Sequence, residues 1–143
     1  MRFSMNKIII MSSITLIVMM GVFIAAETFG EDNILKQRLF GIWRTYDSND
    51  IPWAIQFNED GSFRVAHTSL MLDKTPKDEG KFQLEGTSLI LISNKDGEGS
   101  CKGLKGNYEV KLTEYDKLSL KEQDDQCLER KVVCSGYWIR IFK

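Results

Sequence analysis

Between residues 39 and 142, apolar and polar residues alternate over short stretches, and turn-forming residues separate these stretches. Alternation sends successive side chains to opposite faces of a strand, so it is typical of half-buried β-strands. The pattern predicts eight or nine strands with no helix between them. These strands are expected at residues 39–46, 53–57, 63–68, 81–85, 88–93, 108–112, 118–120, 128–134 and 137–142.

Turn residues between the predicted strands indicate hairpins. The segment 58–61 ends in Gly61, which supplies the positive φ that a tight hairpin turn needs. Residues 86–87 and 115–116 form further turns of this kind. Evenly spaced strands joined by hairpins close best into an up-and-down barrel or a sandwich. We expect an all-β fold, a small up-and-down antiparallel barrel of about eight strands, because closure removes exposed sheet edges.

The N-terminus predicts the compartment. Residues 8–26 carry no charge and follow two positive residues, Arg2 and Lys7. An apolar run of about 20 residues can span a bilayer as a helix, and a positive start before an apolar stretch is also typical of a secretory signal. Because the positive flank stays in the cytoplasm, the rest of the chain is expected to be extracytoplasmic, either membrane-anchored or secreted or periplasmic.

The sequence is compatible with two forms of this segment, a cleaved signal peptide and a retained membrane anchor. The run is long for a signal core, and a cut after Ala26 would put Ile24 where a small residue is preferred. A buried core helix would show a polar stripe, and this run shows none. We divide the chain into 1–26, a signal peptide or single-pass membrane anchor; 27–37, a linker and short helix; and 38–143, the barrel domain.

Charge and chemistry exclude several classes of function. The chain has 19 basic and 20 acidic residues, well mixed, so no basic stripe is available for nucleic acid. The single histidine, His67, is expected to be an ordinary strand residue, with a haem ligand or a polar pocket group as alternatives. Acidic pairs at 78–79 and 124–125 are expected in turns, where neighbouring carboxylates point apart. We expect no catalysis, no metal and no cofactor.

The cysteines Cys101, Cys127 and Cys134 all lie in the part predicted to be exported, where a disulfide is favoured. Their spacing fits no zinc motif. If the strands on either side of residues 115–116 form a hairpin, Cys101 and Cys127 lie together at its open end. We therefore predict a Cys101–Cys127 disulfide and leave Cys134 free.

Four short motifs follow one another along residues 38–142. They are Gly41-Ile42-Trp43, Phe57-Asn58-Glu59-Asp60-Gly61-Ser62-Phe63, Gly80-Lys81-Phe82-Gln83-Leu84 with Leu89-Ile90-Leu91, and the run Cys101, Gly103, Gly106, Tyr108, Asp125, Cys127 and Arg130. In order and spacing they resemble the small bacterial lipocalin-like domains of calycin type. The resemblance implies that an arginine near the last strand covers Trp43 at the closed end of the barrel. Arg140 is the first candidate for this barrel-closing arginine, and Arg130 is the second.

Five aromatic residues lie at the alternate strand positions whose side chains are predicted to point into the barrel, and they are the candidates for binding a ligand. They are Trp53, Phe57, Phe63, Phe82 and Tyr108. Apolar walls are typical of small-molecule pockets, so we expect a domain that binds a small apolar or amphipathic molecule. The alternative is an interaction or structural module of the cell envelope. An internal cavity above about 300 Å³ favours the first function, and a filled barrel with an exposed apolar patch favours the second.

Overall fold

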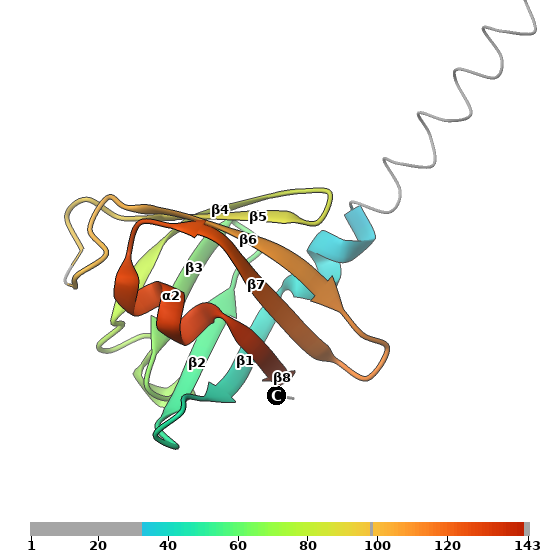
Figure 1. Ribbon diagram of the computed structural model, residues 1–143, viewed down its shortest axis with the longest axis horizontal. Helices are drawn as coiled ribbons and strands as arrows, with labels where there is room; N and C mark the ends of the chain where they lie inside the picture. The colour runs from blue at the N-terminus through green and yellow to red at the C-terminus, as the bar shows by residue number, and fades with distance from the viewer. Residues whose placement is uncertain (1–32, 98, 142–143) are drawn as a thin grey trace, which may run out of the picture.

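The computed structural model describes residues 33–97 and 99–141, which form a closed eight-stranded antiparallel barrel (Figure 1). Strands that follow each other in sequence pair with each other, and the first pairs with the last. The strands are β1 (Gly41–Tyr46), β2 (Pro52–Phe57), β3 (Ser62–Ala66), β4 (Asp78–Glu85), β5 (Ser88–Ser93), β6 (Lys105–Leu112), β7 (Lys117–Asp125) and β8 (Gly136–Arg140). The predicted all-β up-and-down barrel is confirmed. The apolar helix predicted within residues 1–26 lies outside the described residues.

Helical segments accompany the barrel. Residues 33–39 are helical and lead into β1. A 3-10 turn, η1 (Ser69–Met71), lies between β3 and β4, and a helix, α2 (Leu128–Cys134), lies between β7 and β8. None of the helices within residues 33–97 and 99–141 has the length and apolar character needed to cross a bilayer.

The prediction of a strand at residues 128–134 is wrong, because this segment forms α2. Its end, Val132-Val133-Cys134, is rich in residues that favour strands. Arg130 and Cys134, however, are the buried residues of the segment, and they are four residues apart. Val132, midway between them, is 63% exposed. A strand would put all three side chains on one face, whereas a helix buries Arg130 and Cys134 without Val132, so tertiary packing decides the conformation.

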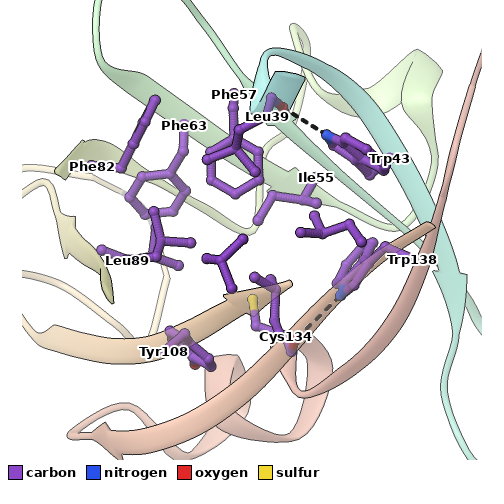
Figure 2. Packing of buried hydrophobic residues seen from close by; sticks show 14 of the residues in the cluster. Leu39, Trp43, Ile55, Phe57, Phe63, Phe82, Leu89, Tyr108, Cys134 and Trp138 are labelled. Carbon is purple, nitrogen blue, oxygen red and sulfur yellow. Dashed lines mark hydrogen bonds between the residues drawn. The ribbon is translucent and has the colours of Figure 1, made fainter. Parts of the chain in front are cut away.

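Side chains fill the interior of the barrel (Figure 2). Every strand contributes apolar residues to one buried cluster. Phe57 and Phe82 meet edge to face there, with ring centroids 5.1 Å apart. The largest fully buried aromatic side chains are Trp43, Trp138, Tyr108, Phe57 and Phe63. A barrel of about eight strands is just wide enough for side chains to occupy its interior in this way.

A small second cluster lies on the outer surface. Ala54 of β2 is paired with Ala66 of β3, and both alternate with inward-facing neighbours. Leu72, which follows η1, is buried against them. Because alanine side chains are small, the β3–β4 connection can pack closely on the barrel wall.

The two ends of the barrel differ in what covers them. We call one the closed end; it carries the helical residues 33–39 and the short turns after β2, β4 and β6. We call the other the open end, and its connections are longer. They are residues 47–51, 67–77, 94–104 and 126–135, the last of which contains α2. Figure 1 shows α2 lying across the barrel, well away from the helical residues 33–39.

Candidate functional site

The closed end is built around Trp43 and Arg140. The two residues are paired between β1 and β8, and the guanidinium carbon of Arg140 lies 4.1 Å from the centre of the Trp43 ring. Arg140 also donates hydrogen bonds to the backbone carbonyls of Arg38 and Phe40. Arg140, and not Arg130, is therefore the arginine that covers Trp43.

The glycine that begins the Gly41-Ile42-Trp43 motif has a steric role in this closure. Gly41 has a φ of +120°, which L side chains rarely adopt. A Cβ at this position would lie 2.9 Å from Nη1 of Arg140. A larger residue would therefore strain the backbone and displace the guanidinium from the indole.

Four of the five residues predicted to line a ligand cavity belong to the packed core. Phe57, Phe63, Phe82 and Tyr108 are each at most 5% exposed. Trp53 is partly buried against the same cluster and borders the surface at the open end. A pocket beside Trp53 and the core offers about 20 Å³, which is room for about one water molecule.

Arg130 of α2 is buried at the open end, with 1% of its side chain exposed. It binds Asp125 in a bidentate pair, through Nε to Oδ2 at 2.8 Å and Nη2 to Oδ1 at 2.9 Å. Its other N–H groups donate to Asp78 Oδ2 (3.2 Å), Ser93 Oγ (2.5 Å) and the Leu104 carbonyl (3.2 Å). All five guanidinium donors are thus used within the protein. Arg130 holds α2 to the open-end loops and has no donor left for a ligand.

The two acids that bind Arg130 have opposite pKa shifts. Burial raises the pKa of Asp78, and hydrogen bonds from Ser93 and Arg130 do not offset it. Burial acts in the same direction on Asp125, but hydrogen bonds from Arg130 and Tyr108 outweigh it, and the pKa of Asp125 is lowered. Burial also raises the pKa of Tyr108, so its hydroxyl stays protonated and donates to Asp125. Asp125 is therefore the principal counter-charge of Arg130.

The last of the four sequence motifs converges on this network. Gly106 of β6 is paired with Asp125 of β7, and a Cβ on Gly106 would overlap the Asp125 carboxylate. The backbone N–H of Cys127 donates to Asp125 Oδ1 at 2.7 Å. The spacing of glycine, acid, cysteine and arginine in the sequence thus corresponds to one physical unit that closes the open end.

A disulfide joins Cys101, in the β5–β6 loop, to Cys127, the residue before α2. This is the pairing expected from the sequence. Cys134, at the end of α2, is a free and fully buried thiol, and Trp138 donates its indole N–H to the Cys134 carbonyl (3.2 Å, Figure 2). Burial raises the pKa of Cys134, which disfavours the thiolate that a nucleophile requires. The helix is therefore held at both ends, and its cysteine is structural.

A groove of about 500 Å³ lies outside this network, between α2 and the ends of β2 and β3. One wall is aromatic: the rings of Trp53 and His67 have centroids 4.1 Å apart. The other wall is α2, which presents Leu128 and Val132, 74% and 63% exposed, together with Val133. A hollow of this size with apolar walls is suited to one small molecule.

Three charged residues, Asp47, Lys77 and Glu129, border the groove. Asp47 accepts a hydrogen bond from the indole N–H of Trp53 at 3.2 Å and two more from backbone N–H groups of its own loop. Desolvation opposes ionisation of Asp47, but these hydrogen bonds outweigh it and lower its pKa. Asp47 thereby fixes the orientation of Trp53, which forms the aromatic wall.

Trp53 is the only groove residue among the five predicted to bind a ligand. Leu128 and Val132 are not among them, because a strand over residues 128–134 would put them on the same face as Arg130 and Cys134, whereas α2 separates the two pairs. Three polar residues in a row, 129–131, separate the two, which breaks the alternation of a strand and is the signal of an amphipathic helix that could have identified them. His67 lies at the end of β3, where it stacks on Trp53, and its Nδ1 has no hydrogen-bond partner among the described residues.

The described residues contain no cluster of three or more His, Cys, Asp or Glu side chains that could hold a metal ion. Comparisons with protein-family models, curated proteins and solved structures found no match. The closed eight-stranded antiparallel barrel is compatible with a lipocalin-like fold.

Proposed function

We propose that this chain is a lipocalin-like, extracytoplasmic binding module without catalytic activity, and that it binds a small apolar or amphipathic molecule in the open-end groove. The observation that carries this proposal is the groove itself. Its volume of about 500 Å³ lies within the roughly 300–1,000 Å³ range of small-molecule sites. Side chains fill the interior of the barrel, and the small pocket of about 20 Å³ lies at the open end, where it shares Trp53, Lys77 and Val133 with the groove.

Two features support an extracytoplasmic location. The charge-free run at residues 8–26 follows Arg2 and Lys7, a pattern of exported or anchored proteins. The disulfide between Cys101 and Cys127 is typical of proteins in oxidising compartments. Both apply whether the N-terminal segment is cleaved or retained as an anchor.

A second candidate function is that of an envelope interaction module, in which the groove receives part of another protein. The filled interior and the exposed Leu128 and Val132 favour it. The two functions differ in whether a free small molecule suffices to occupy the groove. A test with a small apolar probe therefore separates them.

The test is a fluorescence titration with N-phenyl-1-naphthylamine, a neutral apolar dye. We would use the full-length protein in lipid nanodiscs and subtract the signal of empty nanodiscs. Leu128→Ser should weaken binding about tenfold, because burial of a leucine contributes roughly 1.5–3 kcal/mol and the dye covers part of it. Leu70→Ser is the matched control, since Leu70 is 81% exposed and lies outside the groove.

Saturable binding that Leu128→Ser weakens and Leu70→Ser leaves unchanged would support the proposal. Binding that neither substitution changes would place the dye elsewhere and contradict it. An absence of saturable binding above the blank would also contradict it and would favour the interaction module.

A further inference from the structure

The charged residues around the groove differ in whether their charged group makes hydrogen bonds. Lys77 immediately precedes β4, and its backbone N–H donates to the Val65 carbonyl at 2.7 Å, which anchors its position. Its side chain borders the groove and is exposed. Within residues 33–97 and 99–141, its ammonium group makes no ion pair and no hydrogen bond.

The two acids at the groove, by contrast, have hydrogen-bond partners. The carboxylate of Asp47 accepts hydrogen bonds at both oxygens, from the indole of Trp53 and from backbone N–H groups of its loop. Glu129 accepts the hydroxyl hydrogen of Ser100 at 2.5 Å. These neutral donors leave both carboxylates charged, and Lys77 differs from them in that its three N–H donors are unused among the described residues.

The apolar part of the groove is next to this charge. Trp53, Leu128 and Val132 line the same hollow as Lys77. One face of Trp53 is already covered by His67, so the ring is less suited to a cationic head group. The arrangement therefore places the unused donors of Lys77 next to an apolar surface, with the carboxylates of Asp47 and Glu129 at the border of the same groove.

Resting on the proposed function, we infer that the ligand is an amphiphile with an anionic head, a carboxylate, which is bound as a single molecule from solution. The carboxylate binds the Lys77 ammonium group, since charge-assisted hydrogen bonds are stronger than neutral ones. The apolar chain lies between Trp53 and the outer face of α2. A hollow that fits one small molecule favours such a monomer over an extended membrane surface.

The experiment measures how three molecules with the same eight-carbon chain displace the dye. They are octanoate, octyltrimethylammonium and octyl glucoside, each kept below the concentration at which it forms micelles. The full-length protein in nanodiscs is compared with Lys77→Gln and with Lys74→Gln. Lys74 is the matched control because it is exposed in the same loop but does not line the groove.

We expect octanoate to bind most tightly, and Lys77→Gln to weaken it about tenfold while octyl glucoside binds as before. Added salt should weaken octanoate selectively, because it screens an exposed charge pair. Lys74→Gln should change none of the three affinities. This combination would support the inference.

Equal affinities for the three molecules, or no effect of Lys77→Gln on octanoate, would overturn the anionic head while leaving the groove as a binding site. Tighter binding of octyltrimethylammonium than of octanoate would also overturn the anionic head, and would indicate that Asp47 or Glu129 binds the head group. Failure of all three to displace the dye would overturn the inference too. If the dye itself does not bind, the proposed function fails first.

Discussion

An arginine secures each end of the barrel, but the two arginines act in different surroundings. Arg140, 19% exposed, lies on the Trp43 ring and pairs with Asp116, which is 38% exposed. Arg130, 1% exposed, is enclosed by Asp125 and Asp78, whose side chains are 0% and 8% exposed. The closed end is thus held by a partly exposed arginine on a buried indole, and the open end by a buried ionic network.

The difference follows from the connections at each end. Short hairpin turns bring the closed-end strands together, so one arginine over one indole completes the closure. The open end joins loops that are distant in sequence, and Arg130 reaches Asp78 and Ser93 across 52 and 37 residues. Because the network holds α2 from its inner face, the outer face of the helix can keep the exposed Leu128 and Val132 as one wall of a groove.

The largest expected effect separates the two arginines. Arg130→Ala should lower the free energy of unfolding by about 3–5 kcal/mol, because it leaves two buried acids without their partner. Arg140→Ala should lower it by only about 1–2 kcal/mol, because its partners can be hydrated. Denaturant titration measures both, with the exposed Arg44→Ala as a control expected within about 0.5 kcal/mol. Equal losses for Arg130 and Arg140 would refute the contrast between the ends.

A smaller effect concerns the acid stability of the open end. The pKa of Asp125 is lowered by folding, so its stabilisation is present above its ordinary value of 3.8 and is lost as pH falls through the folded value. Asp125→Asn should therefore cost about 2 kcal/mol at pH 7, and the difference from wild type should shrink as pH falls below 3.8. The pKa values of Asp47 and Asp60 are also lowered. Both residues are present in wild type and in the variant, so their contributions cancel in the stability difference.

Asp78 should show the opposite sign. Its pKa is raised by folding, so wild-type stability contains a term that increases as pH falls through the folded value towards 3.8. The Asp78→Asn variant lacks this pH-dependent contribution. The free energy of unfolding of the variant, compared with that of wild type, should therefore be most favourable at neutral pH. Unfolding titrations between pH 7 and pH 2 measure both variants. A pH-independent difference from wild type for either variant would contradict the opposite roles of the two acids.

Many of the strands and turns of the barrel could be predicted because the sequence patterns that specify them involve residues close together in the chain. The alternation of Ile55 and Phe57 with the smaller Ala54 and the polar Gln56, and a turn ending at Gly61, are enough to predict a hairpin. The hairpin that turns at residues 115–116 likewise brings Cys101 and Cys127 together, which is how the disulfide could be predicted. Each of these inferences needs only residues close in sequence or one hairpin register.

The groove could not be predicted in the same way, because it depends on the placement of α2. Val132 and Val133 favour a strand locally, and the burial of Arg130 and Cys134 in tertiary contacts favours the helix. The sequence made Arg130 a second candidate for covering Trp43, whereas its five acceptor atoms belong to four residues, on β4, β5, β7 and the β5–β6 loop. Alternation along a strand also predicts which side chains are buried, but it does not distinguish side chains that line a cavity from side chains that fill a packed core.

The central claim is that ligand binds in the open-end groove and not inside the barrel, and the three tryptophans allow a direct test. Trp53 borders the groove, whereas Trp43 and Trp138 are 0% exposed in the core. The full-length protein, labelled with 5-fluorotryptophan and assigned by single Trp→Phe substitutions, is titrated with N-phenyl-1-naphthylamine and followed by 19F NMR. We predict a saturable shift of the Trp53 resonance while the Trp43 and Trp138 resonances stay in place. A shift of Trp43 or Trp138 comparable to that of Trp53, or no shift of any resonance at saturating dye, would contradict the account.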